Sequence, residues 1–111
     1  MKIYLAGPMR GLPEFNFPAF FAAAKDLRKR GWEVFNPAER DLNRDHFNPK
    51  TDAAKPMAYY MQYDLRAVCR SDAVVVLPGF RKSKGARLEV HVAREIGIPV
   101  LRYPDLKELS S

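Results

Sequence analysis

The chain has 111 residues, of which 47% are hydrophobic and 29% are charged, a composition typical of a folded globular protein and not of a disordered one. An excess of Lys and Arg gives a net charge of +6, which favours an anionic ligand, either a nucleotide phosphate or a nucleic-acid backbone. The single cysteine, Cys69, excludes an internal disulfide and a cysteine-rich zinc site.

The length predicts one domain over residues 1–111. The apolar run from Ile3 to Ala6 is too short for the core of a signal peptide. No apolar run approaches the roughly 20 residues that a bilayer requires. We therefore expect a cytoplasmic protein without a membrane segment.

Hydrophobic periodicity predicts strands that alternate with helices along the chain. Turn residues such as Gly7-Pro8 and Asn36-Pro37 mark the ends of the strands. In chain order, the expected elements are a strand from Lys2 to Ala6, a helix from Phe17 to Arg30, a strand from Trp32 to Phe35, a polar loop from Ala38 to Lys55, a helix from Pro56 to Arg70, a strand from Ala73 to Leu77, a helix from Gly85 to Ile96, a strand from Pro99 to Arg102 and a turn of helix within Pro104 to Leu109.

This alternation predicts an α/β fold with three layers, in which a Rossmann-like or flavodoxin-like parallel sheet of four to five strands carries helices on both faces. Ligands of such sheets bind beyond the carboxyl ends of the strands. Three segments fall at that edge, namely Gly7 to Gly11, the chain after Asn36, and Pro78 to Gly85. We expect them to form one crevice.

Two carboxylates lie on the apolar faces of predicted helices. On a helical projection, Asp64 falls among Met61, Leu65 and Val68, and Glu89 falls between Ala93 and Ile96. A buried ionised carboxylate is costly unless it is paired, and perturbed acids in a cleft are candidates for function. The alternative for each acid is a structural role, paired with an arginine or capping a helix. Because both point inward near the ligand edge, we favour the functional interpretation.

The turn from Ser83 to Gly85 leads directly into a predicted helix. Backbone N–H groups at a helix start bind anions, and Glu89, placed in the first helical turn, would face the group to which that anion is attached. A basic cluster beside this turn favours a phosphate clamp or an electrostatic funnel. The cluster comprises Arg81, Lys82 and Lys84.

Three motifs occur in order along the chain. They are the opening Ile3-Tyr4-Leu5-Ala6-Gly7-Pro8-Met9-Arg10-Gly11, the Asp64 helix that runs into Ser71-Asp72-Ala73, and Ser83-x-Gly85 followed by Glu89 and Ala93. Together they resemble the nucleoside 2-deoxyribosyltransferase superfamily. Arg10 and the Ser83 turn resemble the branch that acts on 2′-deoxynucleoside 5′-monophosphates, and the length and opening resemble small bacterial and phage members of uncharacterised function.

The resemblance implies a role for each motif residue. Glu89 is expected to be the nucleophile at C1′ of the sugar, forming a glycosyl ester, and Asp64 the acid that protonates the departing base. Tyr4 is expected to orient Glu89, with a simple core role as its alternative. Asp72 is expected to support the site, with a capping or turn role as its alternative. The residues implied in substrate and phosphate binding are Gly7, Pro8, Met9, Arg10, Gly11, Ser83 and Gly85.

Electrostatics predicts the protonation state of the two acids. The helix macrodipole and Lys84 are expected to keep Glu89 ionised, and apolar surroundings are expected to keep Asp64 protonated. His91 stands where the family has a glycine that lets the helix approach its neighbour, so crowding there would displace Glu89. Tyr59 and Tyr63, expected to point outward, suit the homodimer interface common in the family and equally suit an ordinary surface.

Three functions follow from these patterns. The leading one is an N-glycosidase or deoxyribosyltransferase that acts on nucleoside 5′-monophosphates and needs no metal or cofactor. The second is a non-catalytic nucleotide-binding or sensing module, which His91 and the short length favour. The third is a nucleic-acid-associated protein, for which charge is the sole support because no RNP, zinc-finger or helix-turn-helix pattern accompanies it. We expect a small-molecule nucleotide as partner, a homo-oligomer, and no membrane or nucleic-acid partner.

Overall fold

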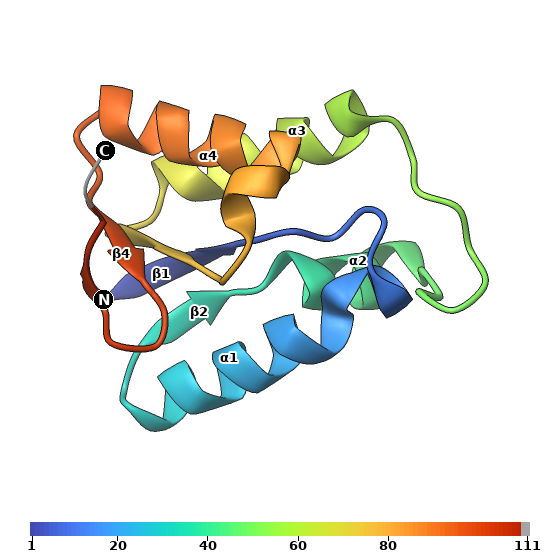
Figure 1. Ribbon diagram of the computed structural model, residues 1–111, viewed down its shortest axis with the longest axis horizontal. Helices are drawn as coiled ribbons and strands as arrows, with labels where there is room; N and C mark the ends of the chain where they lie inside the picture. Colours follow the sequence, from blue (N-terminus) through green and yellow to red (C-terminus); the bar gives the residue numbers. More distant parts are fainter. Residues whose placement is uncertain (110–111) are drawn as a thin grey trace.

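The computed structural model describes residues 1–109, and within them a five-stranded sheet carries helices on both faces (Figure 1). This arrangement confirms the predicted three-layer α/β architecture. The elements in chain order are β1 (Lys2–Ala6), η1 (Pro13–Asn16), α1 (Phe17–Lys29), β2 (Glu33–Phe35), α2 (Pro37–Asp45), α3 (Met57–Cys69), β3 (Ala73–Val76), η2 (Phe80–Lys82), α4 (Lys84–Glu95), β4 (Val100–Arg102) and β5 (Lys107–Glu108).

The strands lie in the order β2-β1-β3-β4-β5, with the first four parallel. Tyr4 of β1 is in register with Phe35 of β2 and with Val74 of β3. All four residues of β3 are buried, as are four of the five residues of β1. Near-continuous apolar runs of this kind are typical of strands that are covered on both faces.

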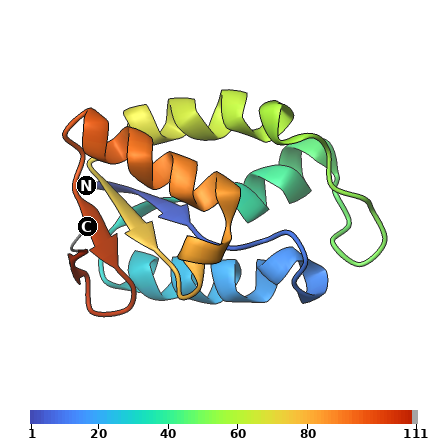
Figure 2. The ribbon, with the colours of Figure 1, turned by 45° about the horizontal axis from the view of Figure 1, so that its top comes forward.

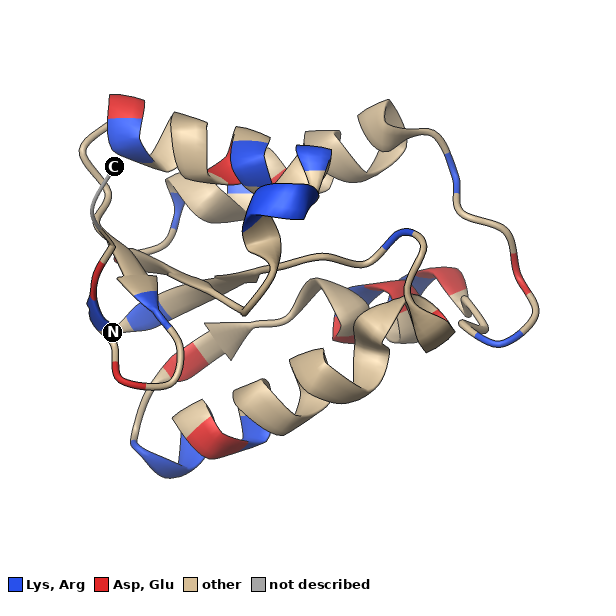
Figure 3. Cartoon of the chain, viewed as in Figure 1, with Lys and Arg blue, Asp and Glu red and all other residues tan. Residues whose placement is uncertain are grey.

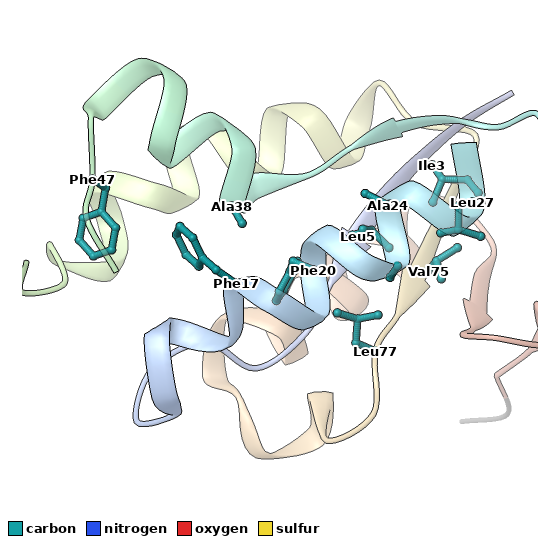
Figure 4. Close-up of a cluster of buried hydrophobic side chains, with 11 residues drawn as sticks. Ile3, Leu5, Phe17, Phe20, Ala24, Leu27, Ala38, Phe47, Val75 and Leu77 are labelled. Carbon is teal, nitrogen blue, oxygen red and sulfur yellow. The ribbon is translucent and has the colours of Figure 1, made fainter. Parts of the chain in front are cut away.

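Alternate residues of the central strands enter different layers of the core. Ile3 and Leu5 pack against the apolar face of α1, where Phe20 and Leu27 are buried (Figure 4). Tyr4 lies in the cluster on the opposite face, with side chains from α3 and α4. Because successive side chains of a strand point to opposite faces, the sequence Ile3-Tyr4-Leu5 fixes the side on which the Tyr4 hydroxyl lies.

The predicted loop from Ala38 to Lys55 is wrong in its first part, because residues Pro37–Asp45 form α2. The side chain of Asn36 accepts a 3.0 Å hydrogen bond from the backbone N–H of Ala38, and Pro37 occupies the first turn, where its missing N–H costs nothing. The helix ends at His46, which is left-handed with φ 53°. Figure 2 shows the remaining loop on the side of the molecule toward which β1 points.

The predicted turn of helix near the end of the chain is also wrong, because Lys107–Glu108 forms β5. This strand pairs antiparallel with β4, with Leu101 opposite Glu108. Leu106 adopts a left-handed conformation with φ 59°, which helps to reverse the chain between the two strands. The antiparallel pairing raises the number of strands from the four clear ones that the sequence predicts to five.

The helices are short. The longest, α1 and α3, have 13 residues each. Within residues 1–109, none has the length and apolar composition needed to cross a membrane.

Candidate active site

A pocket of about 610 Å³ lies at the carboxyl ends of β1 and β3, a volume within the range of pockets that hold small molecules. Tyr4, Asp64 and Glu89 all line it, and they come from β1, α3 and α4. The structure therefore brings together the three residues to which the sequence assigns chemistry. Helix α2 also contributes to the wall, through Pro37 and Asp41.

Tyr4 and Glu89 are in direct contact inside the pocket wall. The Tyr4 hydroxyl donates a 2.7 Å hydrogen bond to Oε2 of Glu89, and its ring stacks on Phe35 with 5.5 Å between centroids. Helix α4 begins at Lys84 after its cap Ser83, which places Glu89 in the second turn and not in the expected first turn. Its carboxylate is thus one turn further from the helix start than the sequence analysis assumed.

Asp64 is buried and forms an ion pair that the sequence analysis did not predict. Its Oδ1 accepts a 2.7 Å hydrogen bond from Nη1 of Arg40, a residue of α2. Nη2 of Arg40 donates to Oδ1 of Asp41 at 2.9 Å. Arg40 therefore bridges two carboxylates, one on its own helix and one on α3.

The pKa of Asp64 is shifted in the expected direction, and the pKa of Glu89 is shifted in the opposite direction to the one expected. Burial raises the pKa of Asp64 to about 6, although Arg40 opposes the effect. Burial, together with the charge of Asp64, raises the pKa of Glu89 well above its usual value, although the hydrogen bond from Tyr4 opposes it. The ion pair with Arg40 favours the ionised form of Asp64, whereas burial favours the protonated form of Glu89.

The start of α4 also lines the pocket. Ser83 caps the helix through a 3.2 Å hydrogen bond from the N–H of Ala86 to its Oγ. Ser83, Lys84 and Gly85 line the pocket together with Lys82. Figure 3 shows Lys and Arg residues gathered on η2 and the first turns of α4. An anion at this helix start would meet both the positive end of the helix dipole and cationic side chains.

The segment after β1 lies against the end of β3. A Cβ at Gly7 would be 2.9 Å from Cβ of Leu77, so only glycine allows this close approach. Gly7, Pro8, Met9 and Arg10 line the pocket. Gly11 is not among the lining residues and takes φ 82° in an exposed turn.

Arg10 is exposed at the mouth of the pocket. Its Nη2 donates a hydrogen bond to the backbone carbonyl of Lys55, and its guanidinium lies 5.7 Å from the centre of the Tyr60 ring. The side chain thus connects the segment after β1 to the loop before α3. A cation in this position can serve an anionic ligand, the closure of the loop, or both.

Asp72 lies at the amino end of β3, the end opposite the pocket. The N–H of Lys2 donates a 2.8 Å hydrogen bond to its Oδ2, and its own N–H donates to the Lys2 carbonyl at 2.8 Å. The structure thus places Asp72 in the capping and turn role, outside the pocket. His91 is exposed on α4, so it does not crowd the inner face on which Glu89 lies.

The expectation that Tyr59 and Tyr63 point outward is wrong, because both pack toward α2. The Tyr59 hydroxyl donates a 2.9 Å hydrogen bond to Asp45, and the Arg44 guanidinium lies 3.8 Å from the centre of the Tyr63 ring.

The sequence analysis also missed the apolar side of the pocket. Phe47 follows α2 and contacts Phe15 and Phe17, at centroid distances of 5.2 and 5.9 Å. All three rings line the pocket. The helix-start signature Asn36-Pro37, with a glutamate three residues after the cap, was the signal that could have revealed α2 and with it Arg40.

The arrangement is suited to acid–base and nucleophilic chemistry on a flat, partly apolar molecule. Two buried carboxyl groups and a tyrosine hydroxyl lie between a helix start and a wall of aromatic rings. Among residues 1–109, no group of three or more His, Cys, Asp or Glu side chains is placed to hold a metal ion.

The fold is that of the 2-deoxyribosyltransferases. A solved structure from work on a 2-deoxyribosyltransferase of Bacillus psychrosaccharolyticus superposes with a TM-score of 0.68 at 24% identity, covering 100% of this chain and 77% of that one. The solution structure of BlsM superposes with a TM-score of 0.67 at 22% identity, covering 91% of this chain and 63% of that one.

The family itself is shown by sequence. The family described as "Domain of unknown function (DUF4406)" matches residues 1–102, and the chain belongs to it. No curated protein matches the chain.

Proposed function

We propose that this protein is an N-glycosidase or deoxyribosyltransferase that cleaves the N-glycosidic bond of (deoxy)nucleoside 5′-monophosphates through a covalent intermediate on Glu89. The observation that carries the proposal is that Tyr4, Glu89 and Asp64 line one pocket beside the start of α4, with Tyr4 hydrogen-bonded to Glu89. The structural neighbour described as a 2-deoxyribosyltransferase supports the general class of glycosyl transfer.

The chemistry begins with a proton transfer inside the carboxyl pair. A proton passes from Glu89 to Asp64, which creates a nucleophilic carboxylate and a general acid in one step. The hydrogen bond from Tyr4 stabilises the charge that Glu89 then carries. The buried site keeps water from competing for either group.

Bond exchange at the sugar follows. A carboxylate oxygen of Glu89 bonds to C1′ while the C1′–N bond breaks, and the electron pair of that bond leaves with the base, which takes the proton from Asp64. Water or the nitrogen of a second base then attacks C1′ of the glycosyl ester, the C1′–O bond to Glu89 breaks, and its electron pair returns to the Glu89 carboxylate. Asp64 accepts the proton of that attacker, so the carboxyl pair again holds one proton.

The phosphate is assigned to the cationic end of the pocket. The start of α4 at Ser83 and Gly85 offers backbone donors and a positive dipole, and Arg10 faces the same space from the mouth. The aromatic wall formed by Phe15, Phe17 and Phe47 is suited to the flat base. The two ends flank the carboxyl pair, where the sugar would lie.

The test is incubation of the protein with a panel of ribonucleoside and deoxynucleoside 5′-monophosphates, with free base measured by chromatography. We expect release from at least one of them and, after rapid acid quenching, a protein mass increased by one sugar phosphate in the wild type and unchanged in Glu89→Ala. Binding of monophosphates without release of base would contradict the proposal and support a nucleotide-binding module. Salt-sensitive binding of DNA with no binding of monophosphates would support a nucleic-acid-associated protein.

A further inference from the structure

We propose that Arg40 is a positioning residue for this chemistry: it acts through Asp64, holding that carboxylate in place and favouring its ionised form. The inference rests on the proposed function, since it assigns a task to a residue behind the same site. Sequence motifs gave no reason to single out Arg40, which was expected to lie in a loop.

The geometry places Arg40 behind the pocket wall. Nη1 donates to Asp64 at 2.7 Å, whereas Nη2 and Nε donate to a single oxygen of Asp41, at 2.9 and 3.3 Å. Asp41 and Asp64 line the pocket, and Arg40 does not. Its side chain is 11% exposed, so the ion pairs are protected from solvent. Arg40 can therefore influence the reaction through the carboxylates and without touching the substrate.

Two helices hold the guanidinium in this orientation. Arg40 belongs to α2, and its guanidinium lies 5.3 Å from the centre of the Tyr63 ring of α3. A planar guanidinium can pair with two carboxylates and a ring face at once, whereas the ammonium of lysine cannot reproduce this geometry. Only arginine can make these contacts with the observed geometry. Lysine would supply the positive charge but not the geometry.

The charges around the carboxyl pair come from every element packed against it. The Tyr4 hydroxyl contacts Glu89 from β1, and the charge of Asp41 on α2 acts on Asp64. Asp45 and Lys55, which are 3.9 Å apart, act on Asp41, and Lys82 and Lys84 line the pocket from η2 and α4. Arg40 is the cation in direct contact with the pair. An arginine beside a carboxylate favours the ionised form, so Arg40 favours negative charge on Asp64. Asp41 opposes this effect because its own charge disfavours a second anion nearby.

These opposing charges predict shifts of opposite sign in two variants. In Arg40→Gln, the loss of the cation should raise the pH at which both Asp64 and Glu89 titrate by about one pH unit or more. In Asp41→Asn, the loss of the neighbouring negative charge should lower the pH at which Asp64 titrates. Arg44→Gln is the matched control, because Arg44 lies one turn away over the Tyr63 ring and has no acidic partner among residues 1–109.

The measurement is a titration of the side-chain carboxyl carbons of Asp64 and Glu89 by NMR in the wild type and the three variants. The inference would be supported if the pH at which the two carboxyl groups titrate rises in Arg40→Gln, falls in Asp41→Asn and changes little in Arg44→Gln. Equal curves for Arg40→Gln and Arg44→Gln would overturn it. The NMR titration does not require catalytic turnover. If the wild type released no base, the proposed function would be contradicted, but the titration would still test the role of Arg40.

Kinetics separates the charge of Arg40 from its shape. In Arg40→Gln, both limbs of the pH profile of base release should move to higher pH. In Arg40→Lys, which keeps the charge, the limbs should stay near their wild-type positions while kcat falls. A loss of activity in Arg40→Gln without movement of the limbs would show a merely structural role and overturn the inference. If Arg40→Gln does not fold, Arg40→Lys and Asp41→Asn provide the same test.

Discussion

The hydroxyl group of Tyr4 donates a 2.7 Å hydrogen bond to Glu89, a residue 85 positions further along the chain. The contact is possible because β1 is an interior strand, between β2 and β3, and α4 packs on the face toward which Tyr4 points. A buried hydroxyl that faces a carboxyl group from a rigid strand fixes the direction in which that carboxyl can react.

Tyr4→Phe should therefore reduce kcat and leave KM nearly unchanged. A hydrogen bond to a charged group contributes about 1.5–3 kcal/mol, which corresponds to a loss of roughly 10- to 100-fold. The ring is retained and its stacking on Phe35 persists, so the fold should be intact. Steady-state kinetics and the circular dichroism spectrum measure the two effects. A wild-type kcat in this variant would show that Tyr4 is only a core residue.

Glu89→Ala should lower kcat/KM for base release by about 10³-fold or more, because the nucleophile is lost. The control is Glu95→Gln, a change to an exposed acid on the same helix, which should be neutral. Chromatography of the free base measures both. Comparable turnover in Glu89→Ala and the wild type would remove Glu89 from the mechanism.

The stability of the wild type should fall as the pH rises from about 4 to 7. The pKa of Asp64 in the folded state is raised to about 6, and that of Glu89 is also raised, so the folded chain binds more protons than the unfolded chain in this range. The stabilisation is complete below the unfolded pKa values and is lost as the pH passes through the folded ones. For Asp64 the loss amounts to roughly 3 kcal/mol.

Glu89→Gln checks this assignment, since it removes a buried carboxyl group whose pKa is raised. We expect its melting temperature to exceed that of the wild type at pH 8 and to be close to it at pH 4.5. Thermal unfolding at a series of pH values measures both curves. Parallel curves for the two proteins would show that Glu89 does not hold the proton in the folded state.

Arg10→Ala should raise KM for nucleoside 5′-monophosphates by about tenfold or more, because a charge-assisted contact with the phosphate is lost. It should leave KM for the corresponding nucleosides nearly unchanged. Arg10 also contacts the Lys55 carbonyl, so equal increases for both substrates would assign it to holding the loop instead. Lys25→Ala, an exposed change on α1, is the control for loss of a positive charge.

Asp72→Ala should lower stability and leave kcat/KM unchanged. Asp72 accepts a backbone hydrogen bond from Lys2 at the end of the sheet away from the pocket, and loss of such a bond costs about 1 kcal/mol. Urea unfolding and the base-release assay test the two halves of this prediction. A marked loss of activity with normal stability would restore Asp72 to the catalytic machinery.

The sequence was sufficient for the parts of the site that depend on periodicity. Asp64 and Glu89 stand at apolar positions of strongly periodic helices, and both prove to be buried, at 6% and 5% exposure. Tyr4 sits in an apolar run whose alternation decides the face on which it lies. These signals are local, so a single sequence can reveal them.

The rest of the site depends on contacts that no local pattern records. Helix α2 is short and mostly polar. Its lack of an apolar face indicated a loop more strongly than its capping residue indicated a helix. The pairing of Arg40 with Asp64 joins residues 24 positions apart on different helices. Strand β5 has two residues and is held by pairing with β4, which intrinsic propensity does not predict.

Helix α2 serves two parts of the pocket, because Arg40 sets the charge on Asp64 while Pro37 and Asp41 form part of the wall. Mutations in this helix would therefore alter reactivity and ligand fit together, which restricts how freely it can diverge among relatives. The segment from 46 to 56 also contributes Phe47 and Ala54 to the lining of the pocket. No ion pair joins this segment to Asp64 or Glu89. New base preferences should accordingly evolve by changes in that segment, with the sequence of α2 retained.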